Sequence, residues 1–186
     1  MAAYPSFNAS NARRLARLEA VERWALHEFW RGNLPVIKNN CSIPNLNHFQ
    51  IVTPFKGIYV SLLSYYSGKG YLYSFAANIN SRISFNHALV ELARNNRVMN
   101  QFEKSPKMIS DFLDISDRRI YFFYTPEGYN LFHQKILCAP HDIKSVPKLI
   151  CDKEILGQWS EYTRVWRYLF ADSFPDSETD HTFFMF

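Results

Sequence analysis

The sequence predicts an α+β domain of two layers, in which helices pack on a mixed β-sheet. Long segments with apolar residues three or four positions apart alternate with short runs rich in β-branched and aromatic residues, the patterns of helices and strands. The 186 residues fit one domain, and 47% of them are hydrophobic and 17% aromatic, enough for a dense core. We therefore expect residues 1–186 to form a single domain.

The first predicted element is a helix from about residue 12 to residue 31. Asn8-Ala9-Ser10-Asn11 supplies capping side chains before it, and Gly32 with Pro35 would end it. At about 100° per residue, one face of this helix is apolar. That face carries Leu15, Leu18, Leu26 and Phe29.

Two glutamates fall on the same face. Glu19 and Glu22 are three residues apart, so both side chains lean the same way. A carboxylate facing a core is costly unless a cation meets it, and Mg²⁺ usually takes one or two carboxylates together with substrate phosphates. Arg23 follows Glu19 at i+4, however, so the two could instead form an ordinary surface ion pair. Spacing alone leaves both interpretations open.

Three β-type runs follow, at residues 48–53, 57–66 and 71–77, after an Asn-rich loop at 38–42. Ser67-Gly68-Lys69-Gly70 joins the last two runs. It lacks the spacing of a phosphate-binding loop and has the composition of a hairpin turn. We therefore expect a β-hairpin here.

Ser84 is expected to cap a second long helix, at about residues 85–102. Glu91 lies within its apolar arc, with Arg94 and Asn95 at i+3 and i+4. Another acid therefore points inward. A buried Glu91–Arg94 or Glu91–Asn95 contact explains it as well as a ligand site does.

The rest of the chain predicts more helices than strands. We expect a short helix at 107–115, two strands at 119–125 and 131–138 joined by a turn at 126–128, and helices at 146–156 and 159–170. The end is acidic over 172–180 and finishes in Phe183-Phe184-Met185-Phe186. Four apolar residues at a terminus more often pack on a neighbouring surface than lie in water.

Composition excludes several functional classes. The net charge is only +4, and the one concentration of basic residues is Arg13, Arg14 and Arg17, on the face of the first helix opposite the acids. A nucleic-acid interface would be denser, so we expect no nucleic-acid partner. Three cysteines without CxxC spacing argue against a disulfide scaffold or a zinc site. With neither a signal peptide nor an apolar run of about 18 residues, we expect a cytoplasmic protein with no membrane partner.

Three segments, in order, resemble one family. The run NASNARRLARLEAVERWALHEFW (8–30) looks like a conserved motif of YcaO-type ATP-dependent cyclodehydratases, in which an alanine-led helix carries E-x-x-E-R and then a tryptophan. About seventy residues later, SFNHALVELARNNRVMNQF (84–102) is similar to the family's A-L-x-E-L-x-Q/R helix. RRIYFFYTPEGYNLFHQKILCAP (118–140) resembles the family's late strand pair.

The resemblance implies a chemistry. YcaO proteins bind ATP with magnesium ions held by glutamates of these helices. Many phosphorylate a backbone amide oxygen of a ribosomally made precursor peptide after a Cys, Ser or Thr side chain has attacked it, and loss of phosphate leaves an azoline ring. Phosphoryl transfer depends mainly on positioning and charge neutralisation, which carboxylates with Mg²⁺ can supply.

The resemblance also implies site residues, by matching positions. The magnesium ligands would be Glu19, Glu22 and Glu91. The nucleotide contacts would be Asn11, Arg23, Glu91 and Arg94, the last at a position where glutamine is commoner.

The likeness covers the C-terminal half of the family, because its earlier S-x-x-x-E-x-x-E-R helix has no counterpart in this sequence. We therefore expect a partial YcaO-like domain that works with a complementary N-terminal half or with a partner protein that presents the peptide's leader. An oligomer is also possible on this view, since the hydrophobic end and the aromatic content favour association. The alternative is a catalytically inactive YcaO-like scaffold or peptide-binding subunit.

Overall fold

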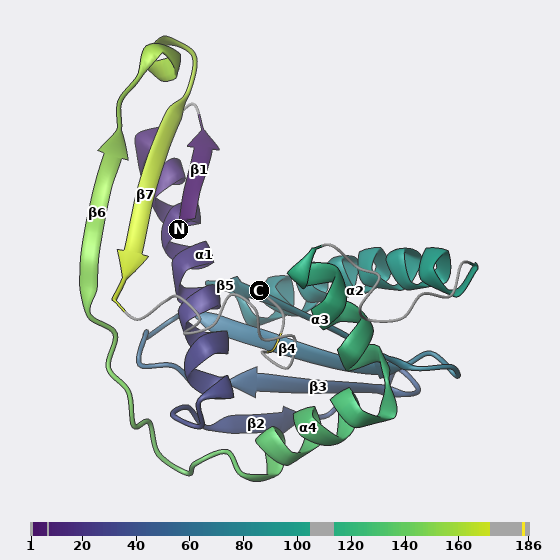
Figure 1. Cartoon of the computed structure of the whole chain (residues 1–186). Coiled ribbons are helices and arrows are strands. Elements are labelled where there is room, and N and C mark those ends of the chain that lie inside the picture. The colour runs from purple at the N-terminus through teal and green to yellow at the C-terminus, as the bar shows by residue number, and fades with distance from the viewer. Residues whose placement is uncertain (1, 7, 105–113, 172–183, 185–186) are drawn as a thin grey trace.

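The computed structural model describes residues 2–6, 8–104, 114–171 and 184, with the side chains of 8–100, 114–171 and 184. Its centre is a four-stranded sheet in the order β2-β3-β4-β5 (Figure 1). The strands are β2 (Val36–Asn39), β3 (Leu46–Ile51), β4 (Tyr59–Tyr66) and β5 (Tyr71–Asn78). The predicted hairpin between the last two is confirmed, and Gly68 in its turn has a φ of 89°, a conformation that favours glycine.

A second sheet of three strands, in the order β1-β7-β6, extends away from the first as an arm (Figure 1). It consists of β1 (Ala2–Ser6), β6 (Leu149–Ile155) and β7 (Arg164–Phe170), with the short 3-10 helix η2 (Gln158–Glu161) at the tip. The α+β class is confirmed, but the mixed sheet was wrong. Every strand pair in the described residues is antiparallel. The neighbouring strands β2 to β5 follow one another through connections too short for the crossover that a parallel pair needs.

Helix α1 (Ala9–Trp30) joins the two sheets, lying against β1 and β7 and then against β5. Asn8 caps it, since its Oδ1 accepts a hydrogen bond of 2.8 Å from the Ser10 N–H. The helix ends before Gly32, whose φ is 77°. The predicted helix is thus confirmed, with its start three residues earlier. Trp24 meets Phe55 edge-on at 5.4 Å in the main core.

Helix α2 (Ser81–Lys104) packs on β4 and β5. Asn80 provides the cap, because its Oδ1 accepts from the backbone N–H groups of Arg82 and Ile83. The prediction that Ser84 is the cap was wrong. The Ser84 hydroxyl donates instead to the Ala76 carbonyl at 2.8 Å and so ties α2 to the sheet.

The two strands predicted at 119–125 and 131–138 are helices α3 (Ile115–Tyr124) and α4 (Pro126–Leu137). The aromatic residues of this segment favoured the prediction of a β-hairpin, but its capping residues favour helices. Thr125 Oγ1 accepts from the Gly128 N–H, and Pro126 occupies the first helical turn, where a missing N–H costs nothing. The apparent turn at 126–128 is therefore the start of a helix. A side chain at Gly128 would collide with the backbone of Phe122 and Phe123.

The helices predicted at 146–156 and 159–170 are instead the strands of the β6–β7 hairpin, except that residues 159–161 belong to the short 3-10 helix η2. In β7, the alternate residues Tyr168 and Phe170 are buried, the period of a strand with one covered face. Neither β1 nor β2 was predicted, and β2 occupies part of the supposed Asn-rich loop. The helix predicted at 107–115 lies outside the described residues, except that Asp114 caps α3 and Ile115 begins it.

Phe184 is fully buried in the main core, where its ring stacks on Trp30 at 5.1 Å. For this residue the expected packing on a neighbouring surface is replaced by packing inside its own chain. The other three residues of the apolar end lie outside the described residues. The three cysteines are free. None of the helices that the structure describes combines the length and the apolar character needed to cross a membrane.

Candidate functional site

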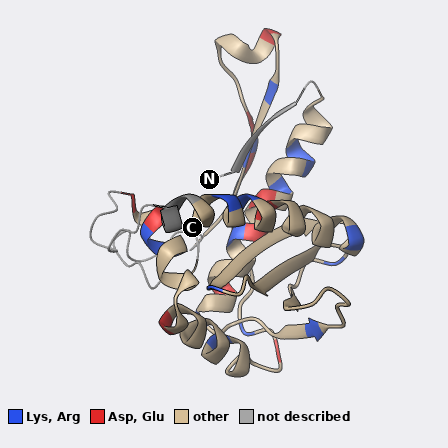
Figure 2. Cartoon of the chain, turned by 90° about the vertical axis from the view of Figure 1, so that its right-hand side faces the viewer, with Lys and Arg blue, Asp and Glu red and all other residues tan. Residues whose placement is uncertain are grey.

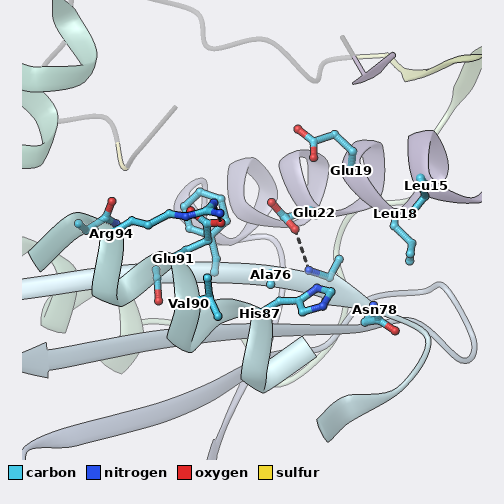
Figure 3. Close-up of a pocket in the computed structure, with 14 residues that line it drawn as sticks. Leu15, Leu18, Glu19, Glu22, Ala76, Asn78, His87, Val90, Glu91 and Arg94 are labelled. Carbon is cyan, nitrogen blue, oxygen red and sulfur yellow. Dashed lines mark hydrogen bonds and ion pairs between the residues drawn. The ribbon is translucent and has the colours of Figure 1, made fainter. Parts of the chain in front are cut away.

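A pocket of about 640 Å³ lies between α1, the outer edge of β5 and α2 (Figure 3). Its volume is within the range of small-molecule sites. α1 contributes Leu15, Leu18, Glu19 and Glu22, and α2 contributes His87, Val90, Glu91, Arg94 and Asn95. The wall between the helices is β5 residues 74–78. Segments about seventy residues apart in the sequence therefore meet here.

Among the described residues β5 is the edge strand of its sheet, so no described strand pairs with its outer backbone groups. Side chains take two of them. Glu22 accepts a hydrogen bond of 2.7 Å from the Ala77 N–H, and Asn95 Nδ2 donates to the Tyr73 carbonyl at 2.7 Å. Because orientation alternates along a strand, the N–H and C=O of Phe75, between these positions, face the same edge. The pocket wall thus offers a ligand a backbone donor and acceptor.

Glu22 is the most perturbed acid of the pocket. Burial raises the pKa of its carboxyl to about 8, and the negative charge of Glu19 adds to the effect, while the Ala77 hydrogen bond opposes it. Glu91 across the pocket raises this pKa slightly further. Glu22 is therefore mostly protonated at neutral pH, and a cation placed beside it would favour the ionised form. Figure 3 shows Glu22 turned toward the β5 backbone and Glu19 farther from it.

The other two acids have arginine partners on their own helices. Glu19 Oε1 accepts from Arg23 Nε at 2.7 Å, the surface pair that the sequence left open. Glu91 pairs with Arg94, in an exposed contact rather than a buried one. Exposed pairs of this kind are weak, so both acids keep the freedom to exchange partners when a ligand binds.

Four of the predicted site residues line this one pocket, namely Glu19, Glu22, Glu91 and Arg94. Arg23 is exposed and is not among the lining residues; its Nε donates to Glu19, and its positive charge opposes the rise in the pKa of Glu22. Asn11 lies about three helical turns from Glu22, where its Oδ1 accepts from Arg14 Nη2 at 2.7 Å, and it is not among the lining residues. The structure brings the acids together and leaves Asn11 apart from them.

The acids do not make a metal cage by themselves. In the parts of the chain that are described, no group of three His, Cys, Asp or Glu side chains is close enough to hold a metal ion. The donor chemistry suits magnesium only when a ligand supplies further oxygens, which is how Mg²⁺ is commonly held beside phosphates. Mg²⁺ would therefore fit this pocket only together with a bound polyphosphate.

Sequence reasoning did not single out His87 or the β5 wall as parts of the site. His87 is exposed at the pocket, four residues before Glu91 and hence on the same side of α2. The i, i+4 spacing of His87 and Glu91 could therefore have predicted that His87 lies beside Glu91 at the site. The backbone groups of β5 were not predictable, because no residue type marks a strand as an edge.

A histidine–serine contact elsewhere is structural. His48 Nε2 lies 3.2 Å from Ser61 Oγ, and burial lowers the pKa of His48. Ser61 is only 2% exposed and Ser84 behind it is fully buried, so a substrate carbonyl could not approach. This geometry does not support nucleophilic catalysis.

Comparison with known proteins adds no assignment: no family model, curated protein or solved structure matches the chain. The function must therefore be argued from the pocket itself.

Proposed function

We propose that the pocket between α1, β5 and α2 binds ATP with Mg²⁺, and that the chain is a component of an ATP-dependent cyclodehydratase acting on a ribosomally made peptide. The observation that carries the proposal is the convergence of Glu19, Glu22 and Glu91 on one pocket. The resemblance of two separate motifs to YcaO proteins named these acids as neighbours of one nucleotide. Glu19 and Glu22 are neighbours on α1, so the informative part of this convergence is that Glu91 of α2 lines the same pocket.

The electrostatics of the pocket supports a bound cation. Without one, Glu22 keeps its proton at neutral pH because burial and the charge of Glu19 act in the same direction. Magnesium with a polyphosphate would offset that cost and supply charge neutralisation for phosphoryl transfer. Glu19 and Glu22 would hold the ion, and Glu91 would contact either the ion or the nucleotide.

The basic and backbone groups of the pocket fit the rest of such a ligand. Arg94 lines the wall opposite Glu22 and, once released from Glu91, presents a fork of donors suited to phosphate oxygens. The Phe75 edge of β5 suits a ligand with an amide-like donor and acceptor side by side, which both adenine and a peptide backbone have. Arg23 would act through Glu19.

Calorimetric titration with Mg·ATP tests the proposal. The chain should bind Mg·ATP but not ATP in the presence of a chelator, and Glu22→Gln should weaken binding at least about tenfold, since one lost charge-assisted contact is worth that much. Binding at pH 7 should release protons, up to about one per site, as Glu22 ionises. Titrations in buffers of different ionisation enthalpy measure that number.

Glu161→Gln, at the exposed tip of the arm, is the matched control and should bind as the unaltered chain does. Absence of magnesium-dependent binding, or full binding by Glu22→Gln, would refute the nucleotide pocket. ATP turnover should then be measured for the chain alone and with a complementary N-terminal half. Glu19→Gln should abolish turnover of the reconstituted pair.

The second candidate is a non-catalytic scaffold or peptide-binding subunit. The internal pairs Glu19–Arg23 and Glu91–Arg94 favour it, because they neutralise two of the three acids without any ligand. On this view the chain binds its peptide or partner protein equally well with and without Mg·ATP. The titration above separates the two candidates directly.

A further inference from the structure

A second, smaller hollow of about 320 Å³ lies on the other side of Leu18, and Leu18 lines both. Its cations come from two separate elements. Arg13, Arg14 and Arg17 belong to the first turns of α1, and Lys56 belongs to the loop between β3 and β4. Figure 2 shows the basic segments on the helix that rises beside the arm. The fold thus brings Lys56 beside the three arginines of α1 in the lining of one cavity.

The charges around this hollow are only partly balanced. Arg13 is matched by Asp152 on β6, with Nε to Oδ1 at 3.0 Å. Arg14 contacts the neutral side chain of Asn11. Arg17 influences the charge of Asp152 at longer range, and neither it nor Lys56 makes an ion pair within the described residues. Several like charges around one small space favour a bound anion.

Apart from Ser10, Gly57 and Tyr168, the remaining lining residues are aliphatic. Leu18 and Ile58 are buried residues that close the floor, and Ile79 on the rim is 56% exposed. A free phosphate ion would use only the cations. A ligand that fills the whole hollow carries an oxyanion beside an aliphatic or aromatic group, and the arginine fork suits a carboxylate.

We infer that this hollow binds an acidic residue of a peptide together with an adjacent apolar residue. Because Leu18 lines both hollows, a peptide anchored here has the Glu22 pocket beside it. The hollow is then the specificity site of the peptide substrate. The inference depends on the proposed function only in taking the ligand to be a peptide; binding here requires neither nucleotide nor turnover.

Selection from a random peptide display library with the full chain as bait tests the inference, because the ligand sequence need not be known. The selected peptides should be enriched in Asp or Glu next to Leu, Ile or Phe. The charge reversals Arg17→Glu and Lys56→Glu together should abolish that enrichment and weaken binding of a labelled consensus peptide at least about tenfold in fluorescence anisotropy. Arg97→Glu, an exposed change on α2 away from both hollows, should leave binding unchanged.

Two measurements distinguish a peptide carboxylate from a free phosphate as the bound anion. Replacing the acids of the consensus peptide by their amides should remove its binding, whereas pyrophosphate at equal concentration should not displace it. Displacement by pyrophosphate, acid enrichment that survives the double charge reversal, or no acid enrichment at all would overturn the inference. Mg·ATP binding by the doubly substituted chain separates the two proposals: it should persist, since both changes lie outside the Glu22 pocket.

Discussion

The Glu22 carboxyl group of α1 accepts a hydrogen bond of 2.7 Å from the backbone N–H of Ala77, on the open edge of β5. One side chain thereby connects the helix that spans both sheets to the strand that forms the pocket wall. The same contact places a titratable group where burial controls its charge. Stability and ligand binding are therefore coupled through Glu22.

Stability should fall with rising pH because of Glu22. Its pKa is about 8 in the folded chain against an ordinary value of 4.5, so between these values the folded chain keeps a proton that the unfolded chain loses. The free energy of unfolding should decline across this window, by at most about 1.4 kcal/mol per pH unit, and level off above pH 8. Glu22→Gln should remove the decline in urea unfolding between pH 5 and 9. A decline of equal slope in this variant would contradict the assignment, and Glu161→Gln serves as control.

The arm should loosen when Asp152 is removed. Asp152 accepts from Arg13 and also from Trp166 Nε1 at 2.7 Å, and the Arg13 hydrogen bond is the main cause that lowers the pKa of Asp152. Asp152→Ala should cost about 1–3 kcal/mol, because it leaves the indole N–H without an acceptor. Hydrogen exchange should accelerate in residues 149–155.

The Asp152 contribution is present above its ordinary pKa of 3.8 and is lost as pH falls through the lower folded value, the opposite direction to Glu22. Glu154→Gln, which affects only the exposed pair with Arg164, should change stability by less than about 0.5 kcal/mol. Equal effects of the two substitutions would show that the arm is not held at Asp152.

Ser84→Ala should destabilise the chain by about 1–3 kcal/mol. The substitution removes the buried hydroxyl that donates to the Ala76 carbonyl and accepts from the Ser61 N–H, so it loses the hydrogen bonds that tie α2 to β4 and β5. Ser81→Ala, at an exposed position one turn earlier, should change little. Thermal unfolding of the two variants checks the difference, and equal midpoints would disprove a structural role for the Ser84 hydroxyl.

Phe184→Ala should cost about 3–5 kcal/mol, the usual loss for a fully buried aromatic ring. The ring fills the space between Trp30 and Phe132. Tyr162→Ala removes a ring that is 73% exposed on the arm and should have a small effect. Denaturant midpoints compare the two, and a neutral Phe184→Ala would mean that this contact is absent in solution.

The local sequence determined the elements that carry the acids. Capping residues and apolar periodicity defined α1 closely, and the Gly-rich turn defined the β4–β5 hairpin. The same signals failed where aromatic residues dominate. Residues such as Phe123 and Tyr168 bury equally well in a helix and in a strand, so composition could not distinguish α3 and α4 from β6 and β7.

The sequence by itself specified an α+β chain and, through helical spacing, the side on which Glu19 and Glu22 project. Only the tertiary structure decided that Glu91 and Arg94 face them across β5, that this strand is an edge, and that Lys56 joins the arginines of α1. The physical reason is that helical periodicity fixes only the direction in which each side chain projects from the axis of its own helix. Distances between elements depend on long-range strand pairing and on how the core packs, and no local pattern encodes either.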